Sequence, residues 1–415
     1  MKKQIHVRAG GGDDPHALRK ETIKTNLITE KEYRYWLCHV PGFGAKKIME
    51  LLRHFGSAEA VWRSDELSLA RAMEQASEEH KLFRKGDLAQ ICSWMPNLDF
   101  FVQEYHKLEE KGIRFITPQD SLYPERLKSL YDMPQGLYVR GNMPGNERPA
   151  VAIVGARNCS HYGEEMAFVL AKELCGRGVD IISGMALGID GAAHRGALSV
   201  GCTYAVLGSG VDICYPRTNF DIFRQLGGGQ RQEGRNLDEG ELIDSKGGLL
   251  SEFPPGTQPH SSNFPLRNRI ISGLADSVIV VEARFRSGSL ITADQAIEQG
   301  RDVYAIPGRV TDPLSRGCNE LIGQGAGIIT DPVDFVEKNF AKQDDCASKR
   351  KKNKIDLALT EEKVYSCLDF SPTHFCTIIH RTGFSAQDTA GILIQLKTRG
   401  LIVETSKNYY ALKFR

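Results

Sequence analysis

The stretch 151–158, Val-Ala-Ile-Val-Gly-Ala-Arg-Asn, decides the fold. Its first four residues form a continuous apolar run, which is typical of a strand that is buried on both faces of a parallel sheet. A helical pattern with Met166, Leu170 and Leu174 follows the polar turn. A buried strand, a glycine-containing turn and a helix in this order predict the start of a Rossmann-like α/β domain.

The same alternation continues along the chain. Further apolar strands are predicted at 179–182, 204–207, 248–250, 277–281 and 303–306, with helical patterns between them. Strands and helices in strict alternation predict an extended, doubly wound parallel sheet with helices on both faces. We assign this domain to residues 112–340, with β-like stretches at its beginning and a polar, glycine-rich surface insertion at 227–247.

Four other segments flank this domain. Residues 1–28 are polar and glycine-rich and predict a disordered tail. Residues 29–111 carry apolar residues at helical spacing and predict an all-α domain. Residues 341–355 form a basic linker. In residues 356–415, three helical patterns precede two short strands, an order that predicts a winged-helix domain.

Composition restricts the class of protein. The chain has 415 residues with 41% hydrophobic and 25% charged residues, which is the balance of a soluble protein with several domains. Its formal net charge of +1 gives no indication of a nucleic-acid or membrane partner. No segment has the roughly 18 apolar residues of a membrane helix, and the N-terminus lacks a signal-peptide pattern. The ten cysteines include no C-x-x-C pair, so we predict a cytoplasmic protein without a metal.

Residues suited to phosphate gather after the predicted strands. Ligands of open α/β sheets bind at the carboxyl ends of the strands, where glycine admits a backbone N–H and arginine can hold a phosphate. Several such turns at one edge indicate a nucleotide or a polyanion. The predicted phosphate-binding residues are Gly155, Arg157, Ser183, Gly184, Arg217, Arg267, Asn268, Arg269, Ser287, Gly288 and Ser289.

Two other kinds of site at this edge are an acid–base catalytic site and a dinucleotide site. Asp190, His194 and Glu282 can in principle act as acid and base in a nucleotide or N-glycosidic-bond hydrolase, although a helix cap and a buried histidine explain the first two more simply. The first turn lacks G-x-G-x-x-G and no acidic residue ends the second strand, which argues against a dinucleotide cofactor. We therefore predict no cofactor and no catalytic residue.

Four ordered blocks carry a family resemblance. They are SGMALGIDGAAH (183–194), FPLRNRIISGL (264–274), EARFRSGSLITADQAIEQGRDVYAIPG (282–308) and SRGCNELIGQGA (315–326). They resemble the DNA-processing protein A (DprA, Smf) family over about residues 123–336. The resemblance implies a protein that binds single-stranded DNA, dimerises through its Rossmann-like domain, protects incoming DNA and loads RecA during natural transformation.

The resemblance also implies roles for particular residues. Arg157 fits the basic residue of the family's Gly-Ser/Thr-Arg turn, and Arg217 fits the basic residue after its Tyr-Pro. The chain departs from the family at Ala156, which replaces a hydroxyl residue, and at Cys318, where Ser or Thr is usual. The hydrolase alternative is disfavoured because its Gly-Gly-x-Gly-Thr turn is absent from the sequence.

The two flanking domains are candidates for additional DNA contacts. The turn Pro41-Gly42-Phe43-Gly44 is similar to the helix-hairpin-helix (or SAM-like) type of the family's N-terminal domain. It makes Gly42, Gly44, Lys46 and Lys47 candidate secondary DNA contacts. The winged helix is open to two interpretations, a DNA-binding module or a protein-docking domain, because its helix 386–399 is basic only at its end.

Overall fold

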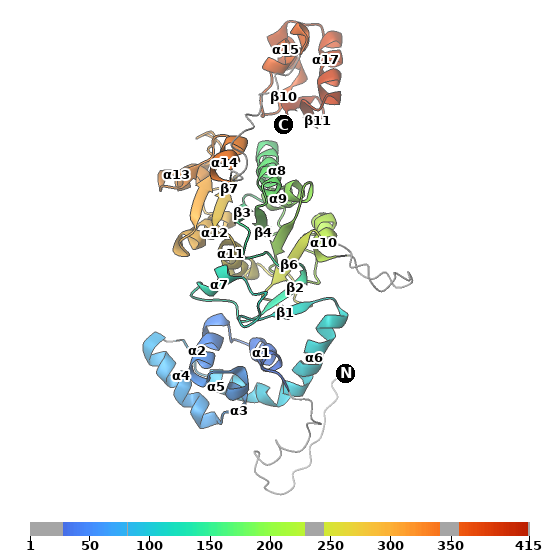
Figure 1. The fold of residues 1–415 in the computed structure, drawn as a ribbon. Helices are drawn as coiled ribbons and strands as arrows, with labels where there is room; N and C mark the ends of the chain where they lie inside the picture. Colours follow the sequence, from blue (N-terminus) through green and yellow to red (C-terminus); the bar gives the residue numbers. More distant parts are fainter. Residues whose placement is uncertain (1–27, 81, 229–244, 341–356, 414–415) are drawn as a thin grey trace, which may run out of the picture.

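The computed structural model describes residues 28–80, 82–228, 245–340 and 357–413 (Figure 1). Nearly all of the predicted N-terminal tail, the whole of the basic linker and most of the insertion at 227–247 lie outside the described residues. Three parts follow one another in Figure 1: a helical part in blue, a sheet with flanking helices from cyan to orange, and a small red C-terminal part.

The central sheet has nine strands in the described residues, in the order β1-β2-β6-β5-β4-β3-β7-β8-β9. From β6 to β9 in this order every neighbouring pair is parallel, as the alternation of strands and helices predicted. The strands are β1 (Arg114–Ile116), β2 (Leu137–Gly141), β3 (Ala150–Val154), β4 (Asp180–Ser183), β5 (Thr203–Val206), β6 (Gly247–Ser251), β7 (Ser277–Val280), β8 (Asp302–Ala305) and β9 (Gly327–Ile328).

One edge of the sheet also contains antiparallel pairs. Strand β2 runs antiparallel to both β1 and β6, with Tyr138 opposite Ser251. Large α/β sheets often carry an antiparallel edge strand on an otherwise parallel sheet. The sheet is therefore mixed, and its parallel part forms the Rossmann-like core.

Helices cover both faces of the sheet, and their buried side chains form two cores. One face is covered by α8, α9 and α14, with Leu170 and Ala193 in its core, and the other by α7, α11, α12 and α13, with Ile270 and Ala293. The helices, with α10 in addition, are α7 (Glu125–Lys128), α8 (His161–Gly176), α9 (Ile189–Leu198), α10 (Phe220–Gly227), α11 (Asn263–Leu274), α12 (Gly288–Glu298), α13 (Arg316–Gly323) and α14 (Pro332–Asn339).

The N-terminal part is entirely helical in its described residues. Thr29 and Glu32 form a capping box that begins α1, and the indole of Trp36 donates a hydrogen bond of 2.9 Å to the carbonyl of Trp94. The helices are α1 (Glu30–His39), α2 (Ala45–Phe55), α3 (Ala58–Arg63), α4 (Glu66–His80), α5 (Asp87–Trp94), the 3₁₀ turn η2 (Met95–Asn97) and α6 (Leu98–Glu110).

Aromatic side chains join this helical part to the antiparallel edge of the sheet. The ring of Tyr35 lies 5.1 Å from Phe115 and 6.1 Å from Tyr138, both edge to face. Arg34 donates to the Gln135 side chain at 3.0 Å. Strands β1 and β2 thus present a packed surface to the helices, and both groups of residues belong to one hydrophobic core.

The C-terminal part is a winged helix. Its three-stranded sheet has the order β10-β12-β11, and Leu393 and Leu396 of α17 are buried in its core. The elements are α15 (Leu359–Ser366), β10 (Thr373–His374), α16 (Phe375–Thr382), α17 (Ala386–Thr398), β11 (Ile402–Ser406) and β12 (Tyr409–Leu412).

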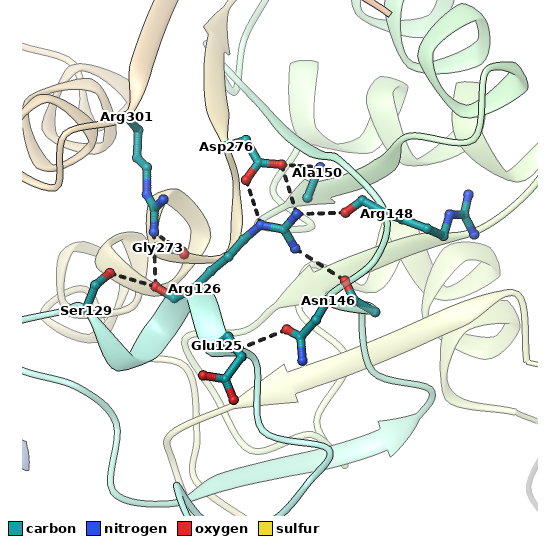
Figure 2. Close-up of polar contacts among 10 residues, drawn as sticks. Glu125, Arg126, Ser129, Asn146, Arg148, Ala150, Gly273, Asp276 and Arg301 are labelled. Atoms are coloured by element: carbon teal, nitrogen blue, oxygen red, sulfur yellow. Dashed lines mark hydrogen bonds and ion pairs between the residues drawn. The ribbon is translucent and has the colours of Figure 1, made fainter. Parts of the chain in front are cut away.

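An arginine network lies where the parallel strands begin, which we call the amino edge (Figure 2). Arg126 of α7 donates twice to the carboxylate of Asp276, at 2.7 and 2.9 Å. The same carboxylate accepts from the backbone N–H of Ala150 at 2.8 Å. Arg301 donates to the carbonyls of Arg126 and Gly273 at 3.0 and 3.2 Å. The network ties the first strand of the core, the end of α11 and α7 to one another.

Candidate phosphate-binding site

The opposite edge, where the parallel strands end, contains the topological switch point. From β3 the chain builds β4, β5 and β6 on one side and then crosses to build β7, β8 and β9 on the other. The helices that follow β3 and β7 cover opposite faces of the sheet, and ligands of such sheets usually bind at this point, outside the carboxyl ends of the strands. We call this the carboxyl edge.

The turn after β3 presents an exposed arginine. Ala156 donates its N–H to the carbonyl of Glu282 at 2.7 Å, which fixes this turn against the end of β7. Gly155 is half-buried, whereas Arg157 is exposed. The guanidinium of Arg157 lies 4.9 Å from the centre of the Phe264 ring. An arginine over an aromatic face keeps its charge while its orientation is restricted.

The turn after β4 is held from within. The N–H groups of Gly184 and Ala186 donate to the buried carboxylate of Asp190, at 3.2 and 3.4 Å. The side-chain amide of Asn219 donates to the carbonyl of Ala186 at 3.0 Å. Burial raises the pKa of Asp190, and the hydrogen bonds oppose this rise. The predicted phosphate contacts Ser183 and Gly184 are both buried, so they support this turn from beneath.

Arg267 fills the space under that turn. It is 4% exposed, and its Nη1 donates to the carbonyls of Gly184, at 2.7 Å, and Val206. Burial lowers the pKa of Arg267 to about 10, while the nearby Asp190 carboxylate opposes the shift. The guanidinium thus stays charged at neutral pH inside the protein, where it links the turn after β4 to the end of β5.

Arg269 points elsewhere. Its guanidinium lies 2.5 Å from the carboxylate of Glu252 and 3.3 Å from that of Asp132. The expectation that Arg267 and Arg269 both face an anion therefore differs from the structure. Residues two positions apart on a helix lie on different faces, so these two side chains cannot converge on one ligand. Asn268 between them donates to the carbonyl of Gly288 at 3.3 Å.

An aromatic pair, which the sequence did not assign to the site, lies beside these residues. Tyr215 stacks on Phe264 with ring centres 5.8 Å apart and an angle of 26° between the rings. Tyr215 is 45% exposed, and Arg217 two residues later is exposed as well. The signal in the sequence is that Tyr215 and Phe264 each precede a proline and, within three residues, an arginine. The aromatic pair Tyr215–Phe264 and the two exposed arginines Arg157 and Arg217 form one group at the carboxyl edge, which we call the proximal platform.

The turn before α12 contributes small polar groups. The hydroxyls of Ser287 and Ser289 lie 2.8 Å apart, and Gly288 between them is exposed. Helix α12 begins here without a side-chain hydrogen bond to its first turn. Unsatisfied N–H groups at a helix start favour an anion, as the sequence predicted for these three residues.

The residues weighed as acid and base have separate structural partners. The Thr203 hydroxyl donates to the carbonyl of Ile181 at 2.7 Å, so it accepts from Nδ1–H of His194 at 2.9 Å. Burial lowers the pKa of His194 to about 3, and the imidazole is neutral. Glu282 accepts from the N–H and hydroxyl of Ser160 at 2.8 and 2.5 Å.

The two departures from the expected pattern have defined environments. Ala156 uses its backbone, as described above. The thiol of Cys318 is fully buried and lies 3.7 Å from the carbonyl of Val280, as a weak hydrogen-bond donor. Burial raises the pKa of this thiol to about 12, so it remains protonated. Both residues therefore form hydrogen bonds with backbone carbonyls of the protein itself.

The two lysines at the start of α2, predicted as secondary contacts, interact with other residues of the protein. The Nζ of Lys47 lies 2.7 Å from the carboxylate of Asp87 and donates to the carbonyl of Gly42 at 2.9 Å. The Nζ of Lys46 lies 4.2 Å from the centre of the Tyr131 ring. The charge of Lys47 is therefore largely compensated.

Two further features concern the described ranges as a whole. No helix there combines the length and the apolar character needed to cross a membrane. No group of three or more His, Cys, Asp or Glu side chains in the same ranges is arranged to hold a metal ion.

Two family models match the chain. A family model described as DNA recombination-mediator protein A matches residues 114–339, from the first strand of the sheet to the end of α14. A model described as DprA winged helix domain matches residues 348–406.

Individual proteins are similar over most of the chain. Protein Smf of Escherichia coli is 35% identical over 312 residues, which cover 74% of this chain and 79% of that protein. DNA processing protein DprA of Streptococcus pneumoniae is 40% identical over 263 residues, 60% of this chain and 85% of that protein. The X-ray structure of the S. pneumoniae protein superposes with a TM-score of 0.55 at 33% identity, covering 76% of this chain and 99% of that chain.

Proposed function

Because this chain belongs to the DNA recombination-mediator protein A family, we propose that it is a single-stranded-DNA-binding recombination mediator without catalytic turnover. In this proposal the strand lies along the carboxyl edge of the sheet, over the proximal platform. The relative of S. pneumoniae is named a DNA processing protein, which supports nucleic acid as the ligand class.

One observation supports the ligand most strongly, which is the combination of two exposed arginines with a stacked aromatic pair at the carboxyl edge. Arg157 and Arg217 are exposed, and neither has a carboxylate within ion-pair distance in the described part of the chain. A single strand offers phosphates to such arginines and unpaired bases to the Tyr215–Phe264 pair. A duplex hides the faces of its bases inside the stack, so single strands fit this surface better.

The remaining parts of the proposal concern partners. We propose that the protein protects incoming DNA, dimerises through the Rossmann-like domain and loads RecA during natural transformation. A filament-assembly assay with RecA on SSB-coated single strands, with and without this protein, tests the loading role. Stimulated assembly is expected, and its absence would remove this role while leaving DNA binding intact.

The double variant R157A/R217A tests the binding site. Each charged hydrogen bond to phosphate contributes about 1.5–3 kcal/mol, so we expect affinity for a single strand to fall by about 100-fold or more. The dependence of log affinity on log salt should become shallower by about 1.4, since each lost phosphate contact removes about 0.7. Fluorescence anisotropy over a range of salt concentrations measures both quantities.

A matched control is Arg71→Ala, since Arg71 is an exposed arginine on α4 of the helical part. It should leave affinity and salt dependence unchanged. Wild-type affinity in the double variant would contradict the assignment of the site.

A further inference from the structure

A second group of exposed arginines lies on the other side of the switch point. The turn after β7 exposes three consecutive residues, Arg284, Phe285 and Arg286. The ring of Phe285 is 43% exposed although phenylalanine is usually buried. None of these residues belongs to the proximal platform.

Backbone hydrogen bonds bring a third arginine to the same ring. The N–H of Ala283 donates to the carbonyl of Leu314, and the N–H of Gly317 donates to the carbonyl of Ala283, both at 2.8 Å. The start of α13 is thereby fixed against the turn. As a result, the guanidinium of Arg316 lies 4.8 Å from the centre of the Phe285 ring.

Arg286 also lies over the Phe285 ring, and its backbone has an unusual conformation. Its guanidinium lies 5.0 Å from the centre of the Phe285 ring, and its φ is 58°. Among the described residues, only Met185, Arg286 and Asn408 combine positive φ with a side chain, and Met185 lies in the turn after β4. Such conformations cost of order 1–3 kcal/mol and cluster at ligand-binding sites.

The charge of this group is not neutralised within the protein. Arg284, Arg286 and Arg316 have no carboxylate within ion-pair distance in the described ranges. Exposed arginines stacked on an exposed ring combine phosphate-binding donors with a face on which a base can stack. The chemistry is the same as that of the proximal platform.

The two groups lie on one continuous edge. Strands β3 and β7 are direct neighbours, and adjacent strands are separated by about 4.8 Å. Asn268, in the helix that carries Phe264, donates to the carbonyl of Gly288, three residues beyond Phe285. A strand of a few nucleotides that leaves the proximal platform across β7 therefore meets the second group next.

We propose that bound single-stranded DNA crosses the switch point and engages a second site, the distal platform, formed by Phe285, Arg286 and Arg316. This inference rests on the proposed function, because it extends the path of the same ligand. Binding then depends on strand length: a short strand occupies the proximal platform alone, and a longer one stacks a base on Phe285 as well.

The test measures affinity for oligonucleotides of about 5 and about 15 nucleotides, lengths within the range of known single-strand sites. Phe285→Leu should weaken binding of the longer strand by about tenfold, since loss of one stacked base costs about 1–3 kcal/mol. It should change affinity for the shorter strand by less than about twofold, on the same energetic scale. Arg316→Ala should reduce the salt slope of the longer strand alone by about 0.7.

Phe285→Tyr is the matched control because it retains an aromatic face, and it should bind both strands like the wild type. Wild-type affinity of Phe285→Leu for the longer strand, or an equal loss for both lengths, would overturn the distal platform. In either case a weakened R157A/R217A variant would leave the proposed function standing. If the wild-type protein bound neither strand, the proposed function and this inference would both fall.

Discussion

The amino and carboxyl edges of the central sheet are both rich in arginine, yet they use it differently. At the amino edge the guanidinium of Arg126 is held by the Asp276 carboxylate, and Arg301 donates to two carbonyls (Figure 2). At the carboxyl edge Arg157 and Arg217 are exposed, and the guanidinium of Arg157 lies over the Phe264 ring. The first set binds the protein to itself, and the second is available to a ligand.

The difference shows that an arginine indicates an anion site only when its donors and charge are left unused. A desolvated ion pair stabilises a fold mainly in the sense that removal of one partner leaves the other uncompensated. Arg267 is the informative exception, because it lies at the carboxyl edge but is buried like a structural residue.

Arg267→Ala should produce the largest effect and would place this residue with the amino-edge group. The substitution leaves the buried Asp190 carboxylate without its cation and two carbonyls without their donor. We therefore expect a loss of about 3–5 kcal/mol in the free energy of unfolding. Urea denaturation followed by circular dichroism measures it.

Arg157→Ala is the control at the same edge and should leave the stability within about 0.5 kcal/mol of the wild type. A stable Arg267→Ala protein with weakened DNA binding would instead place Arg267 among the ligand contacts.

Arg126→Ala should have an intermediate effect. It removes a bidentate ion pair that is partly exposed, so we expect a loss of about 2 kcal/mol in the free energy of unfolding. The affinity of the folded protein for single strands should not change, because Arg126 lies at the other edge of the sheet. Denaturation and anisotropy on one preparation separate the two quantities.

Ser129→Ala is its matched control, since this hydroxyl donates only to the carbonyl of Arg126 in the same helical turn, at 3.0 Å. Its stability should stay within about 0.5 kcal/mol of the wild type. A reduced DNA affinity in Arg126→Ala would break the distinction between the edges.

The smallest effect should appear as acid sensitivity beneath the carboxyl edge. The pKa of His194 is about 3 in the folded protein and 6.5 ordinarily, so between these values only the unfolded chain binds the proton. Its contribution to stability is therefore complete above about pH 6.5 and is lost as the pH falls. Between pH 7.5 and 5.5 it should cost about 1.4 kcal/mol.

His194→Asn keeps a donor for Thr203 but removes the titrating group, so its stability should depend less on pH over this interval. Thermal unfolding at the two pH values measures the difference. An identical pH dependence in both proteins would show that His194 does not titrate in this way.

The sequence predicted the architecture well because each buried parallel strand is a short apolar run that can be recognised without knowing its partner. The apolar run 151–154 and its successors identified the sheet, and all eleven predicted phosphate-binding residues lie around its carboxyl edge or in the helix beside it. The antiparallel pairing of β2 with β6 was not predicted, because it joins segments that are more than 100 residues apart in the sequence.

The details of the site could not be predicted for the same reason. The Arg-Asn-Arg block contains two arginines with equal chemistry, and only the helix orientation separates Arg267, which lies under a loop, from Arg269, which meets two carboxylates. The stacking of Phe264 on Tyr215 joins segments 49 positions apart, and no local periodicity records such a contact.

The fit of Arg267 under Gly184 has a consequence for how this family can vary. A β-carbon at position 184 would stand 2.7 Å from the Nη1 of Arg267, closer than side-chain carbons approach such an atom. A substitution at either position therefore affects the other. A larger residue at 184 displaces the guanidinium, and a shorter residue at 267 leaves the turn after β4 unsupported. Although 83 positions apart, they should be inherited as one unit, and an alignment of relatives should record them as a covarying pair.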